Sequence, residues 1–468
     1  MNSIKANYIY NALYQLLLIL TPLITLPYIS RVLGVEGIGI HSYTHSIAIF
    51  FALFAMLGFD NYGNRMIAKC RDDKKKLSYE FSSLYIYQMF TSILSIIIFI
   101  IYIHFFGAEL KQFLYLQLLL VISSMFNVNW FFWGMEKFKL TVMRSTIVKV
   151  LATASIFIFV NSSNDVGIYI LILTLSVLIR QLSIWVMLRR YVKFKIPNLC
   201  DLTKHIKPSF ILFVPVVSIS LYQYLNRVML GNLSSISELG LYESAMKLIG
   251  VPLVLINALG VVMLPRMSNL VAQDDKDKFY KYISKSIEII SFFAVASMFG
   301  LMAIAVDFSY VFFGEAFIRT GHLVQWLALT ILFVSVANVI RTQYLLPKEK
   351  DKIIMKSNIY GAVVSICVNM LLIPRFHAMG AVIGNISVEL FVMSYVLWAA
   401  RKELPIVNYL KHTLKLLIPG LIMFFAITSL KQIIPNIYVL IFVQVIIGGL
   451  LYGLLNIRFV YRTVKKTA

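Results

Sequence analysis

The chain has 468 residues, of which 60% are hydrophobic and 14% are charged. A soluble domain has about 45–50% apolar and about 25% charged residues, so this chain has too few charged side chains to cover a water-exposed globule of its size. The composition argues against a soluble enzyme and indicates an integral membrane protein. At about 20 residues for each helix that crosses a bilayer, the apolar content sets a ceiling of about 14 spans.

Fourteen apolar stretches, each ended by charged residues or by Gly, Pro or Asn, are predicted to be membrane-spanning helices. Six precede a basic linker, six follow it, and two complete the chain. In chain order they cover residues 8–30, 38–60, 79–103, 112–133, 145–161, 167–188, 209–231, 241–264, 286–307, 323–345, 357–373, 380–400, 413–430 and 437–456. The predicted fold class is therefore an all-α integral membrane protein.

Basic residues are distributed very unequally between alternate loops. Of the 43 Lys and Arg residues, 33 fall on the side of the amino terminus, five in the opposite loops and five inside predicted spans. Because cytoplasmic loops carry the excess of basic residues, both termini are predicted to be cytoplasmic. Orientation and contact with anionic lipid then account for most of the net charge of +22, and no nucleic-acid partner is expected.

The two halves of the chain contain a repeated pattern. Arg31 to Gly34 end the first span, and Arg227 to Gly231 end the seventh in the same way. Copies of the pattern separated by six spans have the same orientation, which predicts a parallel repeat of two six-helix lobes around a central cavity, as in rocking carriers. The predicted division is an N-lobe at 1–190, a cytoplasmic linker at 191–208, a C-lobe at 209–400, and two further helices with a cytoplasmic tail at 401–468.

Three segments carry a family resemblance. They are LPYISRVLGVEGIG at 26–39, LGFDNYGNR at 57–65 and NWFFWGMEKF at 129–138. The sequence resembles the repeat-unit flippases of bacterial polysaccharide synthesis (O-antigen or capsule), in the polysaccharide transporter family of the multidrug, oligosaccharidyl-lipid and polysaccharide (MOP) exporter superfamily. The motifs are stronger in the first half of the chain than in the second.

The resemblance implies a multi-pass transporter of the bacterial plasma membrane, not an enzyme. Such a protein moves an undecaprenyl-pyrophosphate-linked oligosaccharide from the inner to the outer leaflet by alternating access. It needs no cofactor, although coupling to H⁺ or Na⁺ remains open. The implied partners are the lipid-linked oligosaccharide and membrane lipid, with a polysaccharide polymerase and a chain-length regulator as further candidates.

Ionisable residues inside the predicted spans are mostly cationic. An ionisable group within a span is costly and is a functional hypothesis by default. Surplus positive charge in a cavity suits an anionic pyrophosphate, which Arg holds through paired hydrogen bonds. The cations are Lys149, Arg180, Arg227, Lys247 and Arg341, and the two deep acids are Glu243 and Glu389.

We predict that Arg31, Arg227 and Lys247 bind the pyrophosphate, because the two arginines occupy matching positions in the repeat. Each has an alternative interpretation. The arginines would also suit the lipid headgroup region, and Lys247 would pair with Glu243 one helical turn away. Secondary candidates for the cavity are Arg180, Arg341 and Glu243; snorkelling to the membrane surface is the alternative for Arg341, as it is for Lys149.

Two histidines four residues apart, His41 and His45, share one face of the second predicted span. With no third ligand nearby, a zinc site is not expected, and the separate Cys70, Cys200 and Cys367 indicate neither zinc nor a disulfide framework. Proton coupling is the functional hypothesis for the histidines, with packing as the alternative. Glu389 is a second candidate for ion coupling.

Two other classes of protein remain open. A polytopic polymerase, ligase or glycosyltransferase would share the composition, but no outer loop here exceeds about 15 residues or carries a pair of carboxylates for sugar chemistry. A multidrug exporter of the same superfamily should carry acids where this chain has Arg31 and Arg227. The aromatic group Trp130, Phe131, Phe132 and Trp133 is interpreted as a membrane-interface belt.

Overall fold

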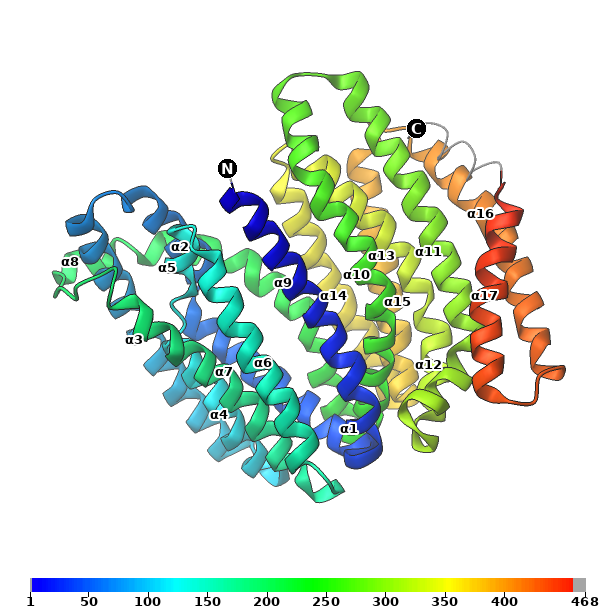
Figure 1. Cartoon of the computed structure of the whole chain (residues 1–468), viewed down its shortest axis with the longest axis horizontal. Helices are drawn as coiled ribbons and strands as arrows, with labels where there is room; N and C mark the ends of the chain where they lie inside the picture. Colours follow the sequence, from blue (N-terminus) through cyan, green and yellow to red (C-terminus); the bar gives the residue numbers. More distant parts are fainter. Residues whose placement is uncertain (1, 458–468) are drawn as a thin grey trace. The chain divides into compact units, whose positions relative to one another are not determined.

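The computed structural model describes residues 2–457 and divides into two compact units, Met1–Val228 and Met229–Ala468. Helices are the regular secondary structure of residues 2–457, which contain no β-strand, so the predicted all-α fold class is confirmed. The helices of the first unit are α1 (Asn2–Met56), α2 (Phe59–Cys70), α3 (Lys74–Phe106), α4 (Lys111–Met125), α5 (Asn129–Gly134), α6 (Phe138–Phe159), α7 (Val166–Leu188), α8 (Leu199–Thr203) and most of α9 (Ile206–Leu233). Figure 1 shows α3, α4, α6 and α7 side by side in this unit.

Helix α1 contains a break at Gly34. Its φ of 68° lies in the left-handed region, which glycine adopts without the steric cost that a Cβ would bring. A straight helix of 55 residues would be about 80 Å long, far longer than a membrane is thick. The break falls between the predicted spans 8–30 and 38–60, so the first two predicted elements are the two parts of one interrupted helix.

An aromatic core joins α2, α3 and α5. Trp130, Phe131 and Phe132 on α5 are completely buried, together with Phe59 and Phe81. The interpretation of these α5 residues as a membrane-interface belt was therefore wrong for all but the half-buried Trp133. The reason is that α5 packs against α2, which places these rings inside the first unit.

The second unit contains the rest of the helices. They are α10 (Ile236–Ala272), α11 (Lys276–Phe313), α12 (Ile318–Leu327), α13 (Leu329–Val339), α14 (Asp351–Phe376), α15 (Ala378–Ala400), α16 (Ile406–Ser429) and α17 (Ile437–Leu455), with a π-helical segment at Ile340–Leu345. Helix α11 packs against α10, α12, α16 and α17 (Figure 1).

Helices α14 and α15 approach each other closely through a small-residue motif. A Cβ at Gly380 would lie 2.5 Å from the backbone of Leu372, and a Cβ at Gly384 would lie 2.0 Å from the side-chain oxygen of Asn369. Glycines four residues apart allow two membrane helices to pack backbone to backbone. This pair therefore forms a rigid hairpin in the second unit.

The number of spans is close to the prediction. Within residues 2–457, eleven helices are long and apolar enough to cross a membrane, or thirteen when each of two bent helix pairs is taken as one span. The count of eleven takes residues 21–70 as one helix, although this segment contains the break at Gly34. The layout of fourteen spans in two lobes and the cytoplasmic location of both termini stay predictions, as do the predicted domain boundaries.

A charge cluster holds the loop before α14 against the loop after α15. Lys348 and Lys350 both donate hydrogen bonds to Glu403, the latter at 2.8 Å. The Lys348 ammonium also lies 5.0 Å from the centre of the Tyr344 ring, within range of a cation–π contact. Burial raises the pKa of the Glu403 carboxyl, but hydrogen bonds from the two lysines and Tyr344 lower it more, to about 2.

This cluster predicts a specific pH dependence of stability. Because folding lowers the pKa of Glu403 from 4.5 to about 2, its stabilising effect is complete above about 4.5 and is lost as the pH falls toward 2. Glu403→Gln is expected to lower the thermal unfolding midpoint of the purified protein at neutral pH, and the difference from wild type should shrink through that acidic range. A difference that is constant with pH would contradict the prediction.

Candidate functional site

The two predicted arginines lie in the first unit. Arg31 is exposed on α1, three residues before the break at Gly34. Arg227 is half-buried on α9, where its Nη1 donates to the backbone oxygen of Gln223 at 2.6 Å. Its guanidinium lies 5.2 Å from the centre of the Tyr224 ring. These contacts are to residues of its own helix and direct the side chain along α9.

Lys247, the third predicted ligand, lies in the second unit on α10. Its Nζ is 4.0 Å from the Glu243 carboxylate, and both side chains are largely buried, with exposed fractions of 28% and 13%. The alternative interpretation of an ion pair along one helix is therefore present in the structure. Lys247 can therefore bind an anionic ligand only if that anion competes with Glu243 for the ammonium group.

The secondary candidates have different surroundings. Arg341 lies in the π-helical segment and donates from Nη2 to the Asn358 side chain on α14 at 2.9 Å. Arg180 is half-buried on α7 and is close enough to Lys149 on α6 for an electrostatic interaction. Glu389 is half-buried on α15. The hydrogen bond to Asn358 therefore holds the Arg341 side chain against α14, whether or not it also reaches the membrane surface.

His41 and His45 stack on one face of α1, as their spacing predicts. Their ring centres are 5.3 Å apart with an angle of 15° between the planes, and Tyr169 of α7 meets His41 edge-on at 5.1 Å. Beside them, the fully buried Gln117 of α4 donates to the Thr44 hydroxyl at 3.4 Å. The first unit thus contains a group of polar, titratable side chains between otherwise apolar helices.

A second polar region in this unit was not predicted from the sequence. A cavity of about 200 Å³ lies at the junction of α1, α2, α4, α7 and α9. Its polar lining comes from Asp60, Asn61, Ser123, Ser124, Asn127 and Gln181. The signal in the sequence was three asparagine or aspartate residues that follow apolar runs, at positions 60, 127 and 129. This signal is weak, because polar residues at the end of a span also occur without any function.

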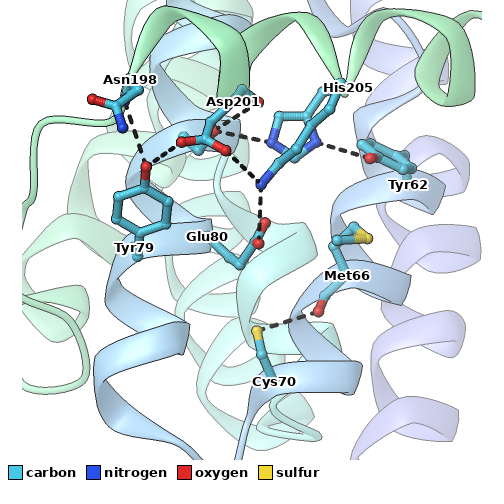
Figure 2. A network of polar contacts seen from close by, with 10 residues as sticks. Tyr62, Met66, Cys70, Tyr79, Glu80, Asn198, Asp201 and His205 are labelled. Atoms are coloured by element: carbon cyan, nitrogen blue, oxygen red, sulfur yellow. Dashed lines mark hydrogen bonds and ion pairs between the residues drawn. The ribbon is translucent and has the colours of Figure 1, made fainter.

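A third network fixes the start of α9 to α2 and α3 (Figure 2). The fully buried His205 has Nδ1 2.8 Å from the Tyr62 hydroxyl and Nε2 3.0 Å from the Ser83 hydroxyl. Asp201 accepts a hydrogen bond from Tyr79, and Lys204 bridges Asp201 and Glu80. These contacts, centred on the buried His205, tie the segment before α9 to α2 and α3.

The segment before α8 is attached to α3 as well. The backbone N–H groups of Lys193 and Lys195 donate to the hydroxyls of Ser78 and Ser82, at 3.2 and 2.9 Å. The stretch predicted as a cytoplasmic linker is therefore held along the first unit by the serines of α3.

Two family models match the chain. The model described as "Polysaccharide biosynthesis protein" covers residues 4–271, and the one described as "Lipid II flippase MurJ" covers residues 155–449. A "Putative O-antigen transporter" of Shigella dysenteriae is 22% identical over 82% of this chain and 96% of its own length. A protein of the same description from Escherichia coli (strain K12) is 23% identical over 86% of this chain and 97% of its own.

Solved structures with the same fold are membrane transporters. A lipid II flippase MurJ in an inward closed conformation has a TM-score of 0.72 and 17% identity, over 98% of this chain and 99% of the other. An inward-facing multidrug resistance MATE family transporter has a TM-score of 0.61 and 13% identity, over 83% and 98%.

The family-model matches, the two relatives and the apolar helices define the class as a multi-pass transporter of the bacterial inner membrane. The chain belongs to the polysaccharide biosynthesis protein family and is a polysaccharide flippase.

Proposed function

We propose that this protein moves undecaprenyl-pyrophosphate-linked oligosaccharide repeat units from the inner to the outer leaflet of the plasma membrane by alternating access. The observation that carries the proposal is the match of the polysaccharide and lipid II flippase models, which together extend from residue 4 to residue 449. One description names polysaccharide biosynthesis and the other names the flipping of lipid II. The names of the two relatives make an O-antigen repeat unit the first substrate to test.

The proposed pyrophosphate ligands are Arg31, Arg227 and Lys247. All three lie within or beside apolar helices, where a cation is costly unless it meets an anion. Lys247 already has Glu243 as a partner at 4.0 Å, so in the proposed role the phosphate replaces the carboxylate as the partner of the ammonium. Arg180 and Arg341 are secondary candidates for contact with the same headgroup.

Transport against a gradient needs an energy source, and we propose ion coupling. No phosphate-binding loop of the G-x-x-x-x-G-K-S/T type is present in the sequence. The stacked pair His41 and His45 is a candidate proton carrier, because histidine changes charge near neutral pH. Glu389 on α15 is the alternative carrier.

The other two classes of protein are less well supported. A multidrug transporter shares the fold, as the MATE likeness illustrates, but the matching family models describe polysaccharide biosynthesis and lipid II flipping. The relatives named above carry the names of transporters and not of polymerases or ligases. A polymerase and a chain-length regulator remain proposed partners.

The proposed function is tested by the leaflet distribution of the lipid-linked oligosaccharide in cells depleted of the protein. We expect the oligosaccharide to accumulate at the inner leaflet and to return to the outer leaflet when the wild-type chain is supplied. Normal export with an altered polymer length would instead support a polymerase or ligase.

A further inference from the structure

Asp60, the second residue of α2, faces the cavity of about 200 Å³ in the first unit. The side chains that line this cavity from α1, α4, α7 and α9 are apolar or neutral. Among the residues that line the cavity, Asp60 is the one with a titratable side chain. Within residues 2–457, Asp60 takes part in no ion pair. A carboxylate in such surroundings must be compensated by oriented dipoles or must bind a cation.

A chain of side-chain hydrogen bonds leads from Asp60 to a buried arginine. Asn127 Nδ2 donates to Asp60 Oδ1 at 3.5 Å, and Asn129 Nδ2 donates to Asn127 Oδ1 at 2.7 Å. Arg144 Nη2 in turn donates to Asn129 Oδ1 at 3.1 Å. Every donor in this chain points from the guanidinium toward the carboxylate, so the relay has a positive end and a negative end.

The relay connects several helices. Asp60 belongs to α2, Asn127 to the turn between α4 and α5, and Arg144 to α6. Asn129 also donates to Gln181 of α7 at 2.9 Å. Because hydrogen bonds in a network polarise one another, loss of the charge at one end weakens the contacts at the other. Asp60 is therefore linked to α6 and α7 by continuous side-chain hydrogen bonds.

The geometry suits a proton better than a metal ion. Asp60 Oδ1 faces an amide N–H, and the side-chain oxygens of Asn127 and Gln181 already accept hydrogen bonds from Asn129. Hard metal cations require several oxygen ligands. The cavity is large enough and polar enough to hold water. Hydronium can then transfer its proton to the carboxylate, giving the carboxylic acid and water.

We propose that Asp60 is a proton-binding site and that the Asn127–Asn129–Arg144 relay transmits its charge state to α6 and α7. The link from this site to transport rests on the function proposed above. Binding of the proton itself does not depend on that function and is measured separately.

The test uses the full-length protein in lipid vesicles, with Asp60→Asn as the variant and the exposed Asp72→Asn as a matched control. Infrared difference spectra between acidic and alkaline samples report the band of a protonated carboxyl. We expect Asp60→Asn to lose one such band and Asp72→Asn to keep it. Asp60→Glu should restore a band, and Asn129→Ala should keep the band up to a higher pH than wild type, because the carboxylate loses its compensating dipoles.

Transport of the lipid-linked oligosaccharide is measured over the same pH series. We expect Asp60→Asn to lose the part of the pH dependence that lies in the range where the wild-type carboxyl band appears, and the control to retain it. An unchanged band and an unchanged pH profile in Asp60→Asn would overturn the proposal. A wild-type response to Na⁺ at constant pH that disappears in Asp60→Asn would also overturn it, in favour of a sodium site. If wild type shows the band but moves no oligosaccharide, the proposed function fails while the proton site stands.

Discussion

Simultaneous replacement of Arg31, Arg227 and Lys247 by alanine is expected to slow the appearance of lipid-linked oligosaccharide in the outer leaflet by about a hundredfold or more. A hydrogen bond to a charged group contributes about 1.5–3 kcal/mol, and about 1.4 kcal/mol corresponds to a factor of ten. Loss of only two such contacts in the transported state would therefore give the stated effect. The measurement is the rate of outer-leaflet appearance in vesicles that contain equal amounts of protein.

The control for this experiment removes the same net charge elsewhere. Lys276, Arg375 and Lys402 are exposed and lie at or just beyond the ends of α11, α14 and α15, so their replacement by alanine should leave the rate within about twofold of wild type. Equal rates for the two triple variants would show that the pyrophosphate ligands lie elsewhere. The two arginines would then be interpreted as markers of the headgroup region.

Features that depend on local spacing were predictable. The interval of four residues places Glu243 and Lys247 on one helix face, and their charged groups lie 4.0 Å apart. The same interval stacks His41 on His45. Gly34 was expected to end the first span, and its positive φ breaks α1 there. Helix periodicity is a property of a few consecutive residues, so it can be read without knowledge of the fold.

Features that depend on packing between distant segments were not predictable. The relay from Asp60 to Arg144 joins residues that are up to 84 positions apart in the sequence (144 − 60). Asn127 and Asn129 follow an apolar stretch, which alone indicates only that a span ends. Nothing in the spacing shows that Arg144, counted among the loop cations, becomes buried against Asn129.

The aromatic residues of α5 show that one sequence pattern is compatible with two structures. Tryptophan and phenylalanine beside charged residues are typical of a membrane interface, and they are also typical of a tightly packed core. Gly63 distinguishes the two here, because a Cβ at this position would lie 2.6 Å from the Trp130 ring. Close contact of this kind needs a partner helix, which the sequence does not identify.

Trp130→Ala is therefore expected to be among the most destabilising single substitutions. The indole is completely buried, stacks on Phe81 with ring centres 5.6 Å apart, and donates from Nε1 to Gln88 Oε1 at 2.9 Å. Truncation of a buried tryptophan costs about 3–5 kcal/mol, and Gln88 is itself completely buried and would lose a partner, at a further cost of about 1–3 kcal/mol.

The neighbouring Trp133 provides the matched control, because it has the same side chain but is half-buried. Trp133→Ala should cost about 1 kcal/mol, whereas a membrane-interface belt would make both tryptophans equally tolerant of replacement. The measurement is the thermal unfolding midpoint of the purified protein together with its abundance in membranes. Trp130→Phe should fall between wild type and Trp130→Ala, since it keeps most of the packing and loses the hydrogen bond. Equal midpoints for the two alanine variants would contradict the buried core and favour the interface.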